Sequence, residues 1–132
     1  MTGRHMQIGE VAERVGLSIR TIRHYEEVGL VPPSSRSDGG FRLYTEPDLA
    51  RLAVVKRMKP LGFTLDEMRD LLTVLDGLAD GRTPDTERAA LRERLATFQT
   101  AAQTRVRALR EQLATAEGFA RQMQDQIDRH ST

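Results

Sequence analysis

Residues 85 to 129 contain no proline, and this long stretch constrains the fold more than any other feature of the sequence. Apolar side chains recur along it in steps of four or three residues, which is the spacing of a coiled-coil seam. One extra four-residue step between Phe98 and Leu109 is expected to relax the supercoil locally. The residues expected to dimerise are Leu91, Leu95, Phe98, Ala102, Val106, Leu109, Leu113, Ala116 and Ala120.

A helix of this length would reach ~65 Å, and the segment before it is too short to cover the whole apolar stripe. Antiparallel pairing of two copies would bury the stripe, so the pattern predicts a homodimer. The alternative is that Gly118 breaks the helix and that the tail folds back as a short hairpin. Both arrangements need a partner surface.

A pair of short helices is predicted near the N-terminus. In the segment IGEVAERVGL, residues 8 to 17, apolar residues recur at helical spacing, and Gly16 can end the helix with a positive backbone angle. Ser18 is a candidate N-cap for a second helix with Ile22 and Tyr25 on one side, whereas Gln7 is a poor N-cap for the first. Two short helices joined by a glycine turn are typical of a helix-turn-helix.

Turn-forming residues then end the second helix and introduce a hairpin. Gly29 and the two prolines after it are incompatible with a continuing helix, and Gly39-Gly40 permit a tight turn. Arg42 and Tyr44 alternate with apolar neighbours, as the two sides of a strand require. These residues predict a small β-hairpin wing.

Two further helices complete the N-terminal head. Thr45 with Asp48, and Thr64 with Glu67, have the spacing of capping boxes ahead of segments with helical apolar periodicity. After them, Thr83-Pro84 resembles an N-cap followed by proline at the first helical position.

We therefore expect a mainly α fold in which a winged helix-turn-helix head precedes one long helix that forms an antiparallel coiled-coil dimer. The expected parts are a disordered lead-in over residues 1–5, the winged head over 6–76, a polar linker over 77–83 and a dimerisation helix over 84–130. No separate effector domain is expected.

Three segments of the head resemble the MerR family of bacterial transcription regulators: IGEVAERVGLSIRTIRHYEEVGL, GGFRLYTEPDLARL and LGFTLDEMRDLL. They occur in the family's order and spacing, the resemblance covers about residues 6 to 76, and the long terminal helix also fits. It departs from the family at His24, where members often carry tyrosine, so the contact there can differ.

The resemblance implies double-stranded promoter DNA as a partner, and the chemistry of the head agrees with it. Arg can pair bidentately with guanine, Ser and Thr can reach phosphates, and wing arginines can straddle the backbone or the minor groove. The residues expected to contact DNA are Ser18, Arg20, Thr21, Arg23, His24, Tyr25, Arg36, Arg42, Tyr44, Arg51, Arg57 and Lys59. Lys56 belongs to the same basic cluster as Arg51, Arg57 and Lys59.

Other kinds of site are disfavoured by composition. The chain has no cysteine, so thiolate metal binding and thiol redox sensing are excluded, and its three histidines are too scattered to suggest a metal site. No cofactor is expected. We find no nucleophile motif, no phosphate-binding loop and no catalytic carboxylate pair, since Glu26-Glu27 and Asp66-Glu67 read as solvent-facing and helix-start charges. No apolar run approaches membrane-spanning length, so a cytoplasmic, nucleoid-associated location is expected.

The function predicted from the sequence is a sequence-specific, homodimeric regulator that reads an inverted repeat and modulates transcription by distorting DNA, with RNA polymerase as a further partner at the promoter. Two alternatives stay open. One is an effectorless architectural DNA binder, and the other is a protein-interaction module whose coiled coil recruits a different protein. A small apolar ligand near Leu95 and Phe98 is a further idea, although these residues already suit a core. Its identity is unknown.

Overall fold

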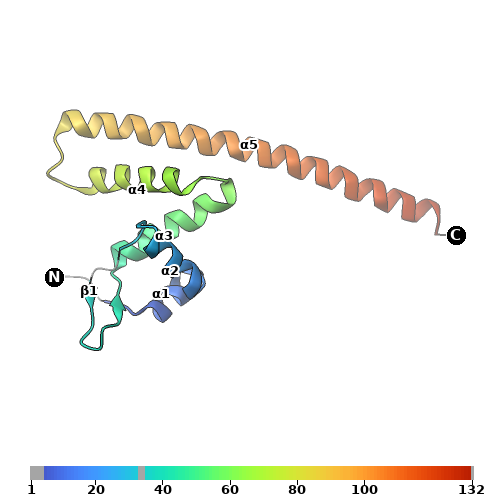
Figure 1. The fold of residues 1–132 in the computed structure, drawn as a ribbon. Helices are drawn as coiled ribbons and strands as arrows, with labels where there is room; N and C mark the ends of the chain where they lie inside the picture. The colour runs from blue at the N-terminus through green and yellow to red at the C-terminus, as the bar shows by residue number, and fades with distance from the viewer. Residues whose placement is uncertain (1–4, 33–34, 132) are drawn as a thin grey trace.

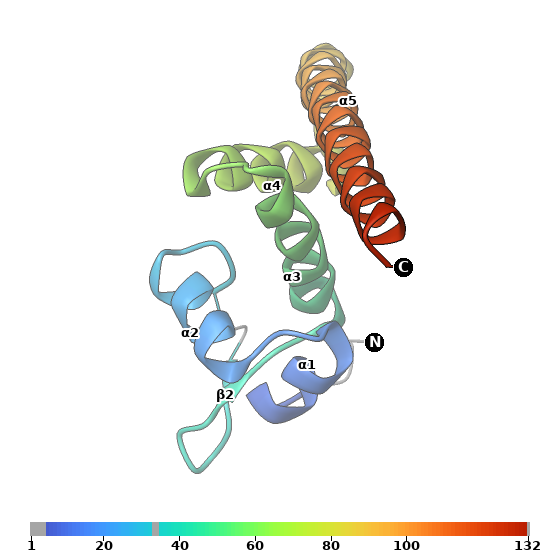
Figure 2. The ribbon, with the colours of Figure 1, turned by 90° about the vertical axis from the view of Figure 1, so that its right-hand side faces the viewer.

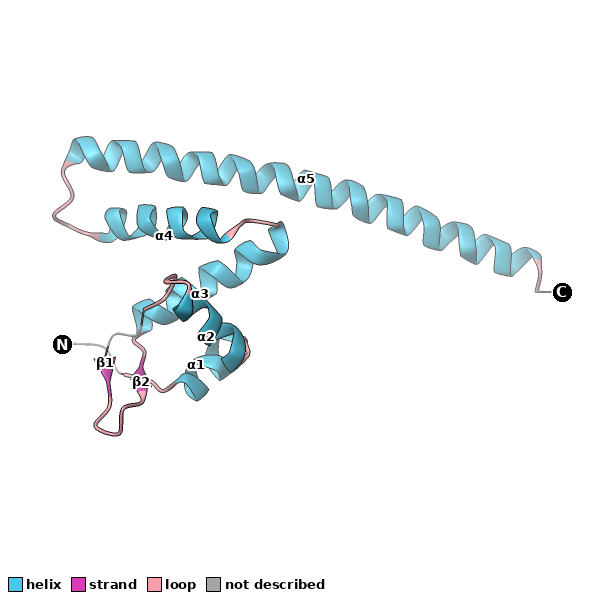
Figure 3. Cartoon of the chain, viewed as in Figure 1, coloured by secondary structure: helices cyan, strands magenta, loops and turns pink. Residues whose placement is uncertain are grey.

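The computed structural model describes residues 5–32 and 35–131. The described chain runs through α1 (Ile8–Val15), α2 (Ile19–Glu27), β1 (Ser35–Arg36), β2 (Arg42–Leu43), α3 (Glu46–Met58), the 3₁₀ helix η1 (Lys59–Leu61), α4 (Leu65–Ala79) and α5 (Asp85–Arg129). Figure 1 shows α1, α2, α3 and the hairpin as a head, with α4 beside the first half of α5 and the rest of α5 projecting alone. Helix dominates and the sheet is small (Figure 3), as predicted.

The helix-turn-helix forms as the sequence predicts. Gly16 ends α1 with φ 76°, and the side chain of Ser18 accepts a hydrogen bond from the Thr21 amide at 3.1 Å, which caps α2. Gln7 makes no side-chain capping bond to α1. Val11, Ile22 and Tyr25 are buried, so the two helices meet through the apolar faces that their periodicity predicts.

The wing is an antiparallel hairpin in which Ser35 pairs with Leu43 and Arg36 with Arg42. The chain reverses through Gly40, whose φ of 82° suits glycine. A single bridge extends this ladder toward the N-terminus, because the amide of Met6 donates to the carbonyl of Tyr44 at 2.8 Å and the reverse bond measures 2.7 Å. Met6 is therefore part of the head, while residues 1–4 of the predicted lead-in lie outside the described residues.

Both predicted capping boxes are present. Thr45 and Asp48 cap α3 reciprocally, and Thr64 and Glu67 do the same for α4. The predicted linker begins too early, because α4 continues to Ala79 and only residues 80–84 connect it to α5. The polar composition of this segment gave the wrong boundary because exposed helix ends are polar as well.

The long helix α5 is continuous through Gly118, so the alternative in which it breaks there is wrong. One glycine costs a helix only about 1 kcal/mol relative to alanine, which the turns on either side of it offset. The start of the helix also differs slightly from expectation. Pro84 is the N-cap residue, and the Thr83 hydroxyl donates to the Gly77 carbonyl at 2.7 Å instead of capping α5.

The main core lies between α1, α2, α3, the wing and the start of α4, and α5 packs against its edge. Seen from the side, α5 lies next to α4 and apart from α1 and α2 (Figure 2). Leu91 is only 8% exposed because α4 covers it, so its predicted place on the dimer seam is wrong. Phe98 and Ala102 are half-buried against the head, whereas Val106, Leu109 and Leu113 are exposed. The head thus covers the first part of the stripe, which the sequence analysis did not foresee.

Arg105 fixes the point where α5 leaves the head. Its guanidinium lies 3.7 Å from the ring centroid of Phe63 and forms an ion pair with Glu67 at 3.6 Å. The Phe63 and Phe98 rings are 6.4 Å apart at their centroids. The direction of the projecting half of α5 is therefore set by contacts with η1 and α4.

Candidate nucleic-acid interface

The exposed side of α2 carries most of the residues predicted to read bases. Arg20, Arg23 and His24 are exposed, and within the described chain none of them forms a hydrogen bond or an ion pair. Ser18 and Thr21 are engaged with each other, their hydroxyl oxygens lying 2.8 Å apart, at the first turn of the helix. The N-terminal half of α2 therefore presents two unpaired arginines and unpaired backbone amides on one surface.

The two arginines of the wing have different partners. Arg36 donates to the Gly40 carbonyl at 2.9 Å, which braces the turn, and the residue is exposed. Arg42 forms an ion pair with Glu26 of α2 and keeps 41% of its side-chain surface exposed. Phe41, next to Arg42, is 63% exposed at the hairpin.

Neither tyrosine lies on the surface. Tyr44 is completely buried and its hydroxyl donates to Glu26, so the prediction that it contacts DNA is wrong. Tyr25 is 2% exposed, so its ring packs in the core beside Ile22, as its helical phase predicts, and its expected contact with DNA stays a prediction. Burial raises the pKa of both phenols above their ordinary value. A tyrosine that follows the apolar phase of its element is better interpreted as core.

The basic cluster predicted on the third helix does not form one surface. Arg51 donates to the Leu30 carbonyl at 3.1 Å and pairs with Asp76 at 2.6 Å, so its guanidinium braces the head, and its contact with DNA stays a prediction. Lys56 donates to the Val15 carbonyl at 2.8 Å.

Arg57 and Lys59, the remaining cations of this cluster, are exposed on different sides. Lys59 borders a small cavity together with His24, whereas Arg57 lines a groove against α5. Lys59 therefore lies near the exposed side of α2 and Arg57 does not.

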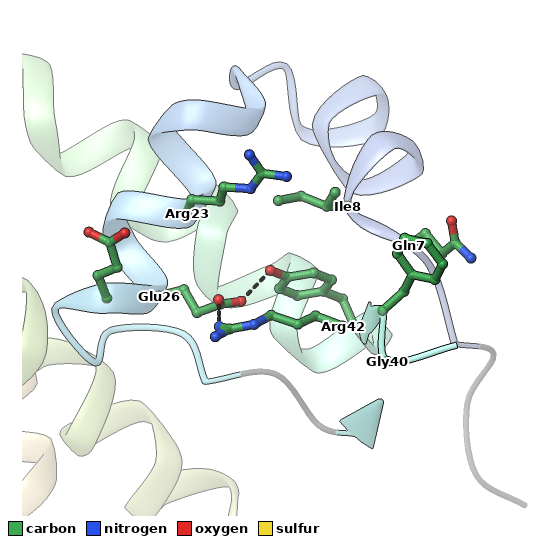
Figure 4. Close-up of a pocket in the computed structure, with 9 residues that line it drawn as sticks. Gln7, Ile8, Arg23, Glu26, Gly40 and Arg42 are labelled. Carbon is green, nitrogen blue, oxygen red and sulfur yellow. Dashed lines mark hydrogen bonds and ion pairs between the residues drawn. The ribbon is translucent and has the colours of Figure 1, made fainter. Parts of the chain in front are cut away.

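A cavity of about 330 Å³ lies between α2 and the wing, and it brings together residues that are distant in sequence. Arg23 and Arg42 both line it, and so do Phe41 and Glu26 (Figure 4). Glu26 is the residue that the sequence analysis misjudged, because its side chain is only 6% exposed. Its position four residues after buried Ile22 was the available signal, since that spacing puts both on one helix face.

Two negative findings concern the described residues alone. Among residues 5–32 and 35–131 no group of three histidine, aspartate or glutamate side chains is placed to hold a metal ion. Within the same ranges no helix combines the length and apolar character needed to cross a membrane.

Sequence comparison with protein families gives two overlapping matches. The model described as MerR HTH family regulatory protein matches residues 6–75, and the model described as MerR, DNA binding matches residues 49–129. The chain is 46% identical over 70 residues to the mercuric resistance operon regulatory protein of Bacillus cereus, which covers 53% of each protein. It is 35% identical over 126 residues to the nodulation protein NolA of a Bradyrhizobium species, covering 94% of this chain and 49% of that protein. The chain thus spans about half the length of these curated relatives.

Solved structures agree in fold. A MerR family transcriptional regulator from Listeria monocytogenes superposes with a TM-score of 0.67 at 26% identity, covering 95% of this chain and 87% of that one. The overlap includes the long terminal helix as well as the winged head, since it extends over nearly the whole chain.

Proposed function

The chain belongs to the MerR family, and from that premise we propose that it is a DNA-binding transcription regulator that acts as a homodimer on promoter DNA. The observation that carries the proposal is the exposed side of α2. Its Arg20, Arg23 and His24 form no hydrogen bond or ion pair within the described chain, and Arg23 lines a cavity together with Phe41 and Arg42 of the wing. A helix of this kind fits the major groove, where arginine reads guanine through two hydrogen bonds.

The proposed interface consists of the exposed polar residues of α2, the wing and η1. Ser18 and Thr21 would bind phosphates near the helix N-terminus, and Arg36, Arg42 and Lys59 would contact the backbone on either side. This set leaves out four residues expected from the sequence. Tyr25 and Tyr44 are omitted because they are buried, Arg51 because its guanidinium is held by Leu30 and Asp76, and Arg57 because it lines the groove between α3 and α5.

The proposed dimer rests on the projecting half of α5. Large apolar side chains are exposed along it, among them Leu109, Leu113 and Met123. A single copy leaves this stripe in water, and an antiparallel second copy would cover it. The proposed seam comprises Leu95, Phe98, Ala102, Val106, Leu109, Leu113, Ala116 and Ala120, without Leu91.

An apolar groove at the head supports the same pairing. It measures about 630 Å³ and is bounded by α3, η1 and α4 on one side and by Leu95, Phe98 and Ala102 of α5 on the other. In an antiparallel pair the N-terminal half of one α5 meets the C-terminal half of the other, so the partner's exposed stripe would enter this groove. The groove lies where the sequence analysis considered a small apolar ligand, and continuity with the seam favours a second copy as the occupant.

Binding of both heads to an inverted repeat would require the DNA to bend or untwist between them, at a cost of several kcal/mol that the phosphate contacts of the wing must offset. Such a distortion would change how RNA polymerase engages the promoter, so polymerase is the expected partner there. The family model and the Bacillus cereus relative are described as regulatory proteins, and we propose that this chain acts on the nucleoid in the cytoplasm and not as an enzyme. No effector is assigned.

The experiment that tests this function is selection of bound sites from random duplex DNA with the full chain at near-physiological salt. Enrichment of one inverted repeat with a fixed spacing is expected. Binding without an enriched motif would support the architectural alternative, and absence of DNA binding together with a retained partner protein would support the interaction module. The salt dependence of the binding affinity should be measured as well, because it becomes steeper with each phosphate counterion that the protein displaces.

A further inference from the structure

The wing is too small to hold its own position. Its two strands have two residues each, and two-stranded hairpins are at best marginally stable in water. Besides the β1–β2 pairing, the backbone of the wing is tied down by the bridge between Met6 and Tyr44. Its orientation relative to α2 must therefore come from side-chain contacts.

Glu26 supplies those contacts from α2. Its carboxylate accepts a hydrogen bond from the Tyr44 hydroxyl and forms an ion pair with Arg42, as the dashed lines in Figure 4 show. Side chains two apart on an extended chain point the same way, so β2 and the residue after it present both donors to α2 together. With 6% of its side chain exposed, the carboxylate depends on these partners, because a buried charge without them is costly.

A carboxylate this close to the proposed DNA-binding surface would weaken DNA binding if its charge were not compensated. Glu26 borders the same cavity as Arg23, the central base-reading candidate, and as Phe41 of the wing. Phosphates repel an uncompensated negative charge, whereas Arg42 neutralises this one. The arrangement thus holds a wing residue at a fixed distance from the residue that reads the bases.

Resting on the proposed function, we propose that Glu26 is the positioning residue that sets the wing against α2, so that both contact DNA as one rigid surface. Arg42 then acts mainly by pairing with Glu26, and its contribution to phosphate binding is secondary. Glu26 does not touch DNA in this proposal.

The test compares Glu26→Gln with Glu27→Gln in the full chain. Both substitutions remove one negative charge from neighbouring residues of α2, and Glu27 is exposed without a partner in the described chain. On duplex DNA carrying the site selected by the parent protein, Glu26→Gln is expected to lower affinity by on the order of tenfold, because it removes a charge-assisted contact. Glu27→Gln is expected to leave affinity unchanged or to raise it, because repulsion decreases.

A DNA-independent measurement separates positioning from general loss of stability. Amide hydrogen exchange of residues 35–44 is expected to accelerate in Glu26→Gln while the amides of α3 and α4 keep their protection. Uniform acceleration across the head would overturn the proposal, because it would show that Glu26 only stabilises the core. Equal effects of the two glutamine variants on affinity would overturn it as well.

A double-mutant cycle tests whether Glu26 acts through Arg42. If it does, adding Glu26→Gln to Arg42→Gln is expected to change affinity less than twofold further, because Arg42→Gln has already removed the ion pair between the two side chains. Independent, multiplicative losses would contradict the proposal. Failure of the parent protein to select any DNA site would refute the proposed function instead, and hydrogen exchange would still decide how the wing is held.

Discussion

At the scale of single residues, position relative to the apolar phase decides which polar side chains are available for binding. Arg23 and Tyr25 are two residues apart on α2, yet one is exposed and the other is buried. Tyrosine joins the core because its ring gains more from burial than its hydroxyl loses, whereas a guanidinium needs a partner. The exposed arginine is therefore tested through DNA binding, and the buried tyrosine through stability.

Replacing Arg23 by alanine is expected to weaken binding to the selected DNA site by about 1–3 kcal/mol, because a bidentate contact to a base is lost. Thermal stability should change by less than about 0.5 kcal/mol, since the side chain is exposed and unpaired within the described chain. Titration of labelled duplex measures the first effect and thermal unfolding the second. Arg94→Ala on α5 is the matched control, and equal loss in both variants would remove Arg23 from the interface.

The two tyrosines predict how stability responds to alkaline pH. Burial raises the pKa of Tyr25 and Tyr44 in the folded chain, whereas in the unfolded chain each phenol ionises near about 10. The unfolded state thus releases these protons first, so their contribution to stability is complete below about pH 10 and is lost as pH rises through the raised pKa. Ultraviolet titration of tyrosinate should show delayed ionisation that becomes ordinary in denaturant, and Tyr44→Phe should reduce the alkaline loss of stability. Ionisation at the ordinary pKa in the native protein would contradict this.

At the scale of elements, local rules predicted helices and caps well and tertiary contacts less well. Gly16, Ser18 and the two threonine capping boxes act through residues next to them in sequence, so their roles could be read directly. The end of α4 and the burial of Leu91 depend instead on contact between α4 and α5, which no local pattern specifies. The same holds for Glu26, whose partners lie 16 and 18 residues further along the chain.

Gly77 and Gly118 both lie within helices, but replacing them by alanine is expected to have opposite effects on stability. A Cβ at Gly118 would lie 3.9 Å from its nearest neighbour in the described chain, so Gly118→Ala should stabilise α5 by up to about 1 kcal/mol through helix propensity. A Cβ at Gly77 would lie 2.6 Å from a methyl carbon of buried Leu91. Gly77→Ala should therefore be destabilising despite the same gain in propensity, because Leu91 must move. Denaturant unfolding measures both variants, and equal stabilisation would mean that Leu91 repacks without cost.

At the scale of the whole molecule, the chain consists of a packed head and a projecting helix with no partner in a single copy. Arg105, Phe63 and Glu67 fix the angle between them. In the proposed dimer this angle determines how both heads face one DNA duplex, so stability of the head and pairing of the helices can be disturbed separately.

Leu109→Glu is expected to dissociate the dimer without unfolding the head. Leu109 is 44% exposed in one copy, so the charge costs little there, but burial of that charge in the seam would be strongly unfavourable. Sedimentation should show a monomer with near-parental circular dichroism in the head, and affinity for the inverted repeat should fall toward that of one half-site. Thr104→Glu adds the same charge on another side of α5 and should remain dimeric. An unchanged dimer in Leu109→Glu would place the interface elsewhere.

The uninterrupted 45-residue length of α5 has a consequence for how such a regulator could change its target. Adding one heptad to both helices of an antiparallel pair would preserve the apolar register and lengthen the pair by about 10 Å. That distance corresponds to roughly three base pairs, over which the DNA groove turns by about 100°. The heads would then face the wrong side of the duplex. The length of α5 and the spacing of the two half-sites in the operator therefore constrain each other, and neither can change gradually unless the other changes with it.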